Sequence, residues 1–171
     1  YRVLQFRRQA QAQVKPAEYR LVEQTLPPAQ AELFRQMPLA SQRHCLNAYY
    51  ALRQAGENDQ EWLGAALLHD VGKQGVRLYH RVANVLLRVL APGLWRRWTT
   101  PGSGPLRRGL HTLRCHGELG ARQLAGSGAP PEMVEIVRRH QGEDSSDLRC
   151  RRFREIDKPL IGEHGLDDYI G

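Results

Sequence analysis

A histidine and an aspartate stand side by side at the end of a strongly apolar stretch. His69 and Asp70 follow the run from Trp62 to Leu68 and precede Val71-Gly72-Lys73. An imidazole and a carboxylate at one point of an apolar interior cost free energy unless a cation binds there, and both groups are good metal ligands. A dipeptide of this kind is also common at solvated helix ends, so the other histidines decide its meaning.

Further potential ligands lie at or near one end of other predicted helices. Together with His69 and Asp70 they make four histidines and two aspartates on apolar helical patterns. The additional residues are His44, His116, His140 (one turn after Ile136) and Asp157 (next to Ile156). We interpret His80, His111 and His164 as bystanders, with His111 close enough in sequence to His116 to approach the edge of a site.

The order His, His-Asp, His, His, Asp resembles the HD superfamily of metal-dependent phosphohydrolases. The elements HDVGK from His69 and HGELGA from His116, followed by a histidine at the end of the next helix, are similar to the HDIG-like branch. The similarity extends over residues 42–158. It implies one metal ion held by His44, His69, Asp70 and Asp157, and a second site completed by His116 and His140 with Asp70 bridging.

The resemblance implies an enzyme that hydrolyses a phosphomonoester, nucleotide or phosphodiester through metal-activated water. Asp70 and Lys73 are then the catalytic candidates, Lys73 meeting a substrate phosphate as a point charge. The alternative for Lys73 is a cation that interacts with a helix dipole. Mixed imidazole and carboxylate ligands suit one or two ions of Fe, Mn, Co, Ni or Zn better than Mg alone. A non-catalytic HD-type regulatory or nucleotide-binding module is the alternative function.

The sequence departs from the family pattern at two places, and the second departure argues against one class of enzyme. Gly117 stands where a proline is common, which removes no ligand. His140 is followed by Gln141-Gly142 rather than by a GYP element. The second departure argues against a cyclic di-GMP phosphodiesterase of the HD-GYP type.

Most of the chain shows apolar residues at three- and four-residue spacing, with Pro or Gly at the breaks. We predict an all-α fold, a single HD-type helical bundle, with residues 1–38 as an N-terminal helical extension, 39–158 as the HD domain and 159–171 as a C-terminal tail. A basic helix reaches toward Trp98 before an irregular segment, Thr99 to Pro105, and at least one of Trp95 and Trp98 is expected in the core. The predicted helices are Pro16 to Gln24, Pro28 to Met37, Ala40 to Ala55, Gln60 to Asp70, Tyr79 to Leu90, Pro105 to Ala125, Pro131 to His140 and Asp147 to Asp157.

Composition limits the partners and the compartment. The chain has 171 residues, a net charge of +7 and three cysteines without paired spacing, which favours reduced thiols and a cytoplasmic protein. The apolar runs are too short for a membrane span. Between Arg77 and Arg154 stand 15 arginines and six acidic residues, a field that attracts a phosphorylated small molecule or nucleotide. Charge alone leaves nucleic acid as a minor alternative, and the oligomeric state stays open.

Overall fold

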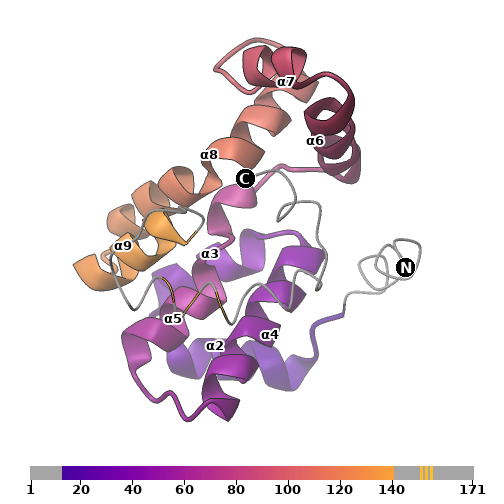
Figure 1. Cartoon of the computed structure of the whole chain (residues 1–171). Coiled ribbons are helices and arrows are strands. Elements are labelled where there is room, and N and C mark those ends of the chain that lie inside the picture. Colours follow the sequence, from indigo (N-terminus) through magenta and orange to yellow (C-terminus); the bar gives the residue numbers. More distant parts are fainter. Residues whose placement is uncertain (1–12, 141–150, 152, 154, 156–171) are drawn as a thin grey trace.

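The computed structural model of the chain describes residues 13–140 together with positions 151, 153 and 155. Within these residues the regular elements are helices and no strand occurs, which confirms the predicted all-α fold (Figure 1). The elements are α2 (Pro16–Thr25), α3 (Pro28–Gln36), α4 (Leu39–Gln54), α5 (Gln60–Leu68), the 3-10 turn η1 (Val71–Lys73), α6 (Leu78–Leu90), α7 (Pro92–Trp98), α8 (Pro105–Gly126) and α9 (Pro131–Arg139).

Helix α5 lies at the centre of the core because its sequence leaves it no polar face. Every residue from Trp62 to Leu68 is buried. At the other end of the helix the exposed Asp59 side chain accepts hydrogen bonds from the backbone N–H groups of Glu61 and Trp62, which satisfies the first turn. The apolar helix therefore begins at the surface and carries its C-terminal end, where the His-Asp pair stands, into the interior.

Helices α2 and α3 contribute to the same core as the rest of the bundle. Val22 of α2 and Phe34 of α3 are at most 1% exposed and belong to one cluster with the α5 side chains. Residues 13–38 thus pack directly against the central helix. The boundaries 1–38, 39–158 and 159–171 stay a prediction, and the proposed tail lies outside the described residues.

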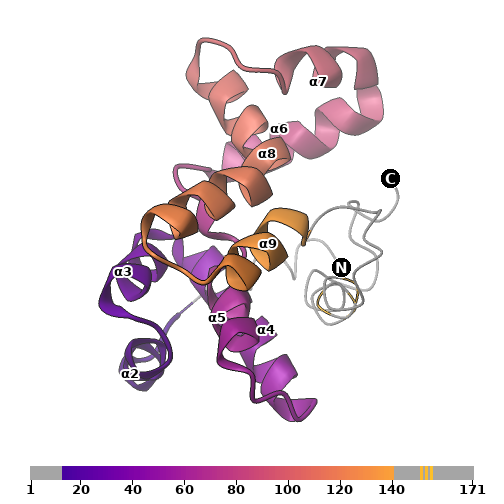
Figure 2. The ribbon, with the colours of Figure 1, turned by 90° about the vertical axis from the view of Figure 1, so that its left-hand side faces the viewer.

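Helix α8 is the longest described element and joins two parts of the molecule. Its 22 residues correspond to about 33 Å. One half packs against η1 and α9, and the other half contacts α6 and α7. Figures 1 and 2 show α6 and α7 at one end of α8, away from α2–α5. We call α6 and α7 together the α6–α7 arm.

The arm corrects two expectations. The basic helix toward Trp98 is divided at Ala91, whose backbone leaves the helical region (φ −145°, ψ 63°), and a new helix starts at Pro92, which has no N–H to continue the first. Trp95 and Trp98 are both half-buried, so neither is a core residue. Instead, the indole N–H of Trp95 donates to Asn84 over 2.8 Å, which ties α7 to α6.

The other predictions agree with the structure at the level of elements. The matching helices differ by one or two residues at their ends, and Thr99 to Gly104 is irregular as expected. The predicted helix Asp147 to Asp157 lies largely outside the described residues, although Arg151, Phe153 and Glu155 are helical. In the part of the chain that the structure describes, no helix has the length and apolar character needed to cross a membrane.

Candidate metal centre

Four helices bring five potential ligands to one point in the interior. His44 comes from α4, His69 and Asp70 follow α5, His116 lies in the middle of α8, and His140 ends α9. They form two groups, one of His44, His69 and Asp70 and one of Asp70, His116 and His140. Within each group the potential ligand atoms lie within 4.8 Å of one another. Asp70 belongs to both groups, so its carboxylate faces both sets of imidazoles.

The cluster is almost completely shielded from solvent. His69, Asp70, His116 and His140 are each at most 4% exposed, and His44 is half-buried. Burial of so many polar side chains without compensation is costly. Packing alone would not offset this cost. The cluster is therefore better explained as a binding site than as part of the packed core.

The three buried histidines share one orientation. Each Nδ1 lies within hydrogen-bond distance of the backbone carbonyl three residues earlier, and because a carbonyl only accepts, Nδ1 carries the proton. The opposite nitrogen, Nε2, then presents its lone pair, as in metal-binding histidines whose orientation a second hydrogen bond fixes. The Nδ1 to O distances are 2.9 Å from His69 to Ala66, 2.8 Å from His116 to Leu113 and 2.7 Å from His140 to Val137.

Nε2 of His116 shows how the cluster fits a cation. This buried atom has no hydrogen-bond partner among the described residues and lies 3.7 Å from Oδ1 of Asp70. A lone pair and a carboxylate oxygen at this separation suit coordination of a shared divalent ion. The donor set of imidazole nitrogens and a carboxylate therefore fits the transition metals predicted from the sequence.

Asp70 is held as a carboxylate by the charges around it. Burial by itself raises the pKa of Asp70, but the opposing charges, of which the Lys73 ammonium is the strongest, outweigh this effect and hold the pKa well below its usual range. Nζ of Lys73 lies 2.9 Å from Oδ1 and donates a hydrogen bond to Oδ2 over 3.1 Å. Asp70 is thus negatively charged at neutral pH.

Two of the buried histidines, His116 and His140, are held neutral. Burial lowers the pKa of His140 to about 4, with the charge of a protonated His69 acting in the same direction. Burial also lowers the pKa of His116 well below its usual value, and Lys73 and His140 add to this effect. Neutral imidazoles beside a carboxylate are the protonation states that a metal ion requires of its ligands.

Close backbone packing places Asp70 next to α8. A Cβ atom on Gly72 would lie 2.0 Å from the carbonyl oxygen of His116 and 2.7 Å from the backbone nitrogen of Gly120, so only glycine allows η1 to lie against α8 at this distance. A Cβ on Gly117 would likewise lie 2.8 Å from the carbonyl oxygen of Arg138 in α9. The glycines at these contacts bring the potential ligands near α5, α8 and α9 together.

A model of the HD domain family matches residues 42–160, well over half of the chain. The chain belongs to the HD domain family. No curated protein and no solved structure matched the chain. HD domains are typical of metal-dependent phosphohydrolases and bind divalent metal ions. The two His/Asp groups of this HD domain could hold such an ion.

The structure brings together most of the site residues predicted from the sequence. His44, His69, Asp70, His116 and His140 share the cluster, whereas Asp157 lies outside the described residues. The roles of all six as ligands stay a prediction.

The residues around the predicted ligands have separate structural contacts. Lys73 forms an ion pair with Asp70, three residues earlier, which the sequence interpretation did not anticipate. Nδ1 of His111 lies 2.9 Å from the carbonyl of Thr99, and His80 contacts Pro105, so both make structural contacts on α8 or its approach. His164 lies outside the described residues.

Further groups, whose positions beside the cluster the sequence did not predict, surround the potential ligands. The ring centroid of Phe153 lies 5.4 Å from that of His69, and Sγ of Cys45 lies 3.6 Å from Nδ1 of the same histidine. The backbone carbonyls that orient the histidines carry no signal in the sequence. For Cys45 a weak signal existed, because it adjoins His44 on a helix whose neighbouring residues are buried.

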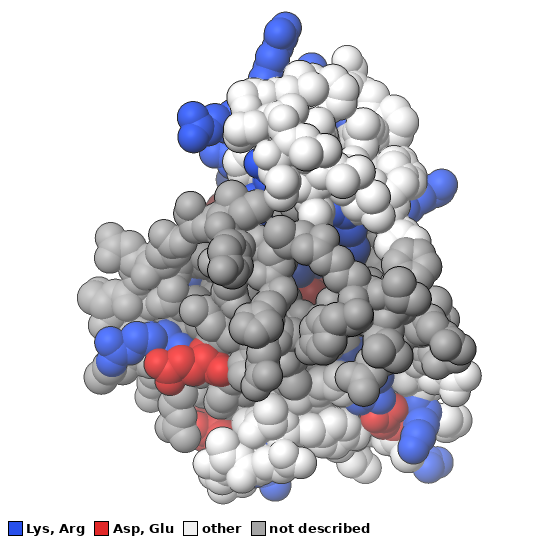
Figure 3. All heavy atoms as spheres, turned by 45° about the vertical axis from the view of Figure 1, so that its right-hand side comes forward, with Lys and Arg blue, Asp and Glu red and all other residues white. Residues whose placement is uncertain are grey.

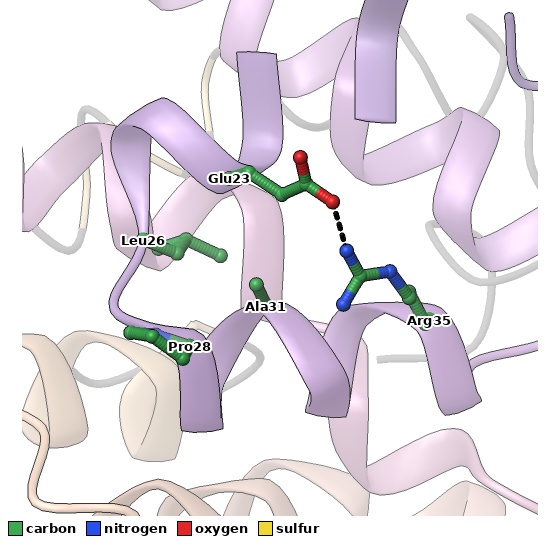
Figure 4. A pocket seen from close by; sticks show the side chains of 5 residues that line it. All are labelled: Glu23, Leu26, Pro28, Ala31 and Arg35. Atoms are coloured by element: carbon green, nitrogen blue, oxygen red, sulfur yellow. Dashed lines mark hydrogen bonds and ion pairs between the residues drawn. The ribbon is translucent and has the colours of Figure 1, made fainter. Parts of the chain in front are cut away.

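A separate hollow lies between α2 and α3 (Figure 4). Its lining combines Leu26, Pro28 and Ala31 with the ion pair between Glu23 and Arg35. The lining contains no histidine, and the ion pair satisfies its charged groups. The histidine cluster, rather than this hollow, is therefore the candidate functional site.

Proposed function

We propose that this HD domain is a metal-dependent phosphohydrolase of the HDIG-like branch that acts on a phosphomonoester, nucleotide or phosphodiester. The observation that carries the proposal is the position of Asp70 in both groups of potential ligands. A carboxylate shared by two ligand groups is the arrangement expected of a bridging ligand between two cations. We propose His44, His69, Asp70 and Asp157 as ligands on one side and Asp70, His116 and His140 on the other.

Asp157 keeps its place in the proposed ligand set because of a neighbour in the sequence. Phe153, four residues earlier, is 1% exposed and contacts the His69 ring. Phe153 itself thus lies beside the cluster.

The side chains of this chain would hold and orient the reacting groups. The buried histidines keep Nε2 directed at the ion because the backbone holds Nδ1. Lys73, whose side chain is 18% exposed, is the accessible cation beside Asp70 and is proposed to bind a substrate phosphate oxygen. When bound, the divalent ions supply Lewis-acid polarisation of the phosphoryl group and lower the pKa of a water molecule.

The proposal is tested by a phosphate-ester screen of the purified chain loaded separately with Mn, Fe, Co, Ni or Zn. We expect turnover that chelation abolishes and that His116→Ala lowers by about 100-fold or more. His111→Gln is the matched control because His111 lies on the same helix and hydrogen-bonds Thr99 outside the cluster. Turnover of this control is expected to stay within about twofold of the wild type.

Two outcomes of the screen would contradict the proposal. Bound metal without turnover on monoesters, diesters and nucleotides would favour the non-catalytic regulatory or nucleotide-binding module. Unchanged turnover in His116→Ala would remove the second ligand group from the reaction. In the same screen, the ratio of turnover on monoesters to turnover on diesters would identify the substrate class.

A further inference from the structure

Exposed large apolar side chains concentrate in the α6–α7 arm among the described residues. On α6 they form a continuous row, which we call the apolar stripe. The stripe consists of Leu78, Val82, Leu86, Val89 and Leu90, which are 47%, 46%, 51%, 53% and 76% exposed. Apolar patches of this kind on a water-soluble surface mark sites of interaction with a partner or a membrane.

The apolar stripe is the outward face of a helix whose other face is already packed. At about 100° per residue, the five stripe positions fall within an arc of about 120°. His80, on the opposite side, is 4% exposed and contacts the carbonyl of Pro105 at the start of α8. Asn84, on the same inner side, accepts the Trp95 hydrogen bond. Packing within the described structure therefore uses the polar side of α6 and leaves the apolar side exposed.

The charge of this region has one sign. Residues 71–117 contain Lys73 and eight arginines but no aspartate or glutamate. Among these arginines, Arg77, Arg96, Arg97 and Arg108 are exposed. In Figure 3 the part of the surface formed by the arm is white with blue groups at its edges. Within residues 71–117 every charged neighbour of this apolar surface is a cation, which makes the surface complementary to a partner that is apolar inside and negatively charged at its surface.

We propose that the apolar stripe of the α6–α7 arm docks this protein on the surface of an anionic phospholipid bilayer. The acyl region would receive the stripe, and the headgroup phosphates and carboxylates would pair with the bordering arginines, as for basic amphipathic helices at membrane interfaces. Helix α6 has 13 residues and is about 20 Å long, shorter than the roughly 30 Å hydrocarbon core. It would therefore lie along the bilayer surface.

Charge and side-chain type disfavour the two other occupants of this surface. A second copy docked stripe to stripe would bring two carboxylate-free cationic regions together, which costs free energy through repulsion of like charges. Nucleic acid would satisfy the arginines, but the stripe consists of aliphatic side chains, which do not stack with bases as aromatic rings do. Tyr79, beside the stripe, is the only aromatic residue among the exposed large apolar side chains that the structure describes. The bilayer satisfies both the charges and the stripe.

The test is flotation of the full chain with vesicles of phosphatidylcholine alone or with about 30% phosphatidylserine. We expect binding to the anionic vesicles that falls as salt is added. The double substitution Leu86→Ser and Val89→Ser should lower this binding by about tenfold or more because both side chains would no longer enter the acyl region. Leu39→Ser is the matched control, since Leu39 on α4 is equally exposed at 53% and should leave binding unchanged.

A second pair of substitutions tests the charge. Arg96→Gln with Arg97→Gln should weaken binding to anionic vesicles severalfold and reduce its dependence on salt. If the Leu86/Val89 double variant loses its helical circular dichroism, Leu90→Ser replaces it, because Leu90 is the most exposed stripe residue.

Four results would overturn the proposal. The first is absence of binding to anionic vesicles, and the second is unchanged vesicle binding of a folded stripe variant. The third is a dimer in sedimentation that the stripe substitutions dissociate, which would assign the surface to a second copy. The fourth is binding of nucleic acid, but not of vesicles, by the wild type, together with loss of this nucleic-acid binding in the stripe variants.

Discussion

The histidine cluster and the α6–α7 arm place side chains in opposite environments, each unfavourable for the groups that it holds. In the cluster, polar groups such as Asp70 and His116 are withdrawn from water. In the arm, apolar groups such as Leu86 and Leu90 are left in water. Each region loses this cost when a matching partner binds, a cation in the first case and an apolar surface in the second. We therefore propose both regions as binding surfaces, one for a cation and the other for an apolar partner.

The largest expected change in the free energy of unfolding comes from substituting a leucine of α5, and a leucine of α6 serves as the comparison. Leu67 is fully buried, whereas Leu86 in the apolar stripe is 51% exposed. Leu67→Ala should lower the free energy of unfolding by about 3 to 4 kcal/mol through lost burial and a cavity. Leu86→Ala should change it by about 0.5 kcal/mol or less. Chemical denaturation of both variants checks this, and equal losses would show that the stripe is packed in solution.

The next largest change in stability is expected at Gly72, and Gly93 serves as the comparison. Gly72→Ala would place a methyl group 2.0 Å from the His116 carbonyl, and we expect destabilisation by about 3 kcal/mol as η1 and α8 are forced apart. Gly93→Ala in α7 meets no atom within 4 Å and should be neutral or stabilising by up to about 1 kcal/mol. A stable Gly72→Ala variant in urea denaturation would be inconsistent with the close contact between η1 and α8.

A smaller effect concerns the attachment of the arm. Nδ1 of His80 accepts the backbone N–H of Arg77 over 2.9 Å, and Nε2 donates to the carbonyl of Pro105 over 3.1 Å. His80→Ala removes both bonds and should cost about 1 to 2 kcal/mol. Hydrogen exchange should show faster exchange in α6 and α7 and nearly unchanged exchange in α5. Uniformly faster exchange would mean that the arm and the core unfold as one unit.

The smallest effect is the pH dependence that His80 contributes. Burial lowers its pKa, and the charge of Arg77 acts in the same direction against the opposing hydrogen bond to Pro105. A histidine whose pKa is lower in the folded state stabilises the fold above its unfolded pKa of about 6.5 and loses this contribution as pH falls below that value. His80→Gln should therefore lose less unfolding free energy than the wild type between about pH 7.5 and 5.5. An identical loss in both proteins would contradict the assignment.

The sequence predicted helices and ligand positions well where local chemistry determines them. The apolar run from Trp62 to Leu68 predicts a buried helix, and His69 and Asp70 follow it in every packing arrangement. Gly120, within the HGELGA motif, lies against Val71, Gly72 and Val137, where a Cβ atom would be in tight contact. Clustering of His44, His116 and His140 with the pair came from the order of motifs, since residues so far apart in sequence meet only through tertiary packing.

What could not be predicted depends on contacts made after the helices form. Helix α6 has the periodicity of a core helix, yet its apolar side is exposed because α8 contacts the side that carries His80. The pairing of Lys73 with Asp70 depends on the 3-10 turn between them. Trp95 lies against α6 through its bond to Asn84 rather than in the core, which its size alone had favoured.

The central claim is that Asp70 binds a divalent ion shared by the histidine cluster, and calorimetric titration of the metal-stripped chain with Mn²⁺ or Co²⁺ tests it most directly. We expect binding by the wild type and a loss of affinity of about 100-fold or more in Asp70→Asn. Asp59→Asn, an exposed carboxylate at the other end of α5, should bind as the wild type does. Wild-type affinity in a folded Asp70→Asn variant, or no binding by the wild type, would contradict the account.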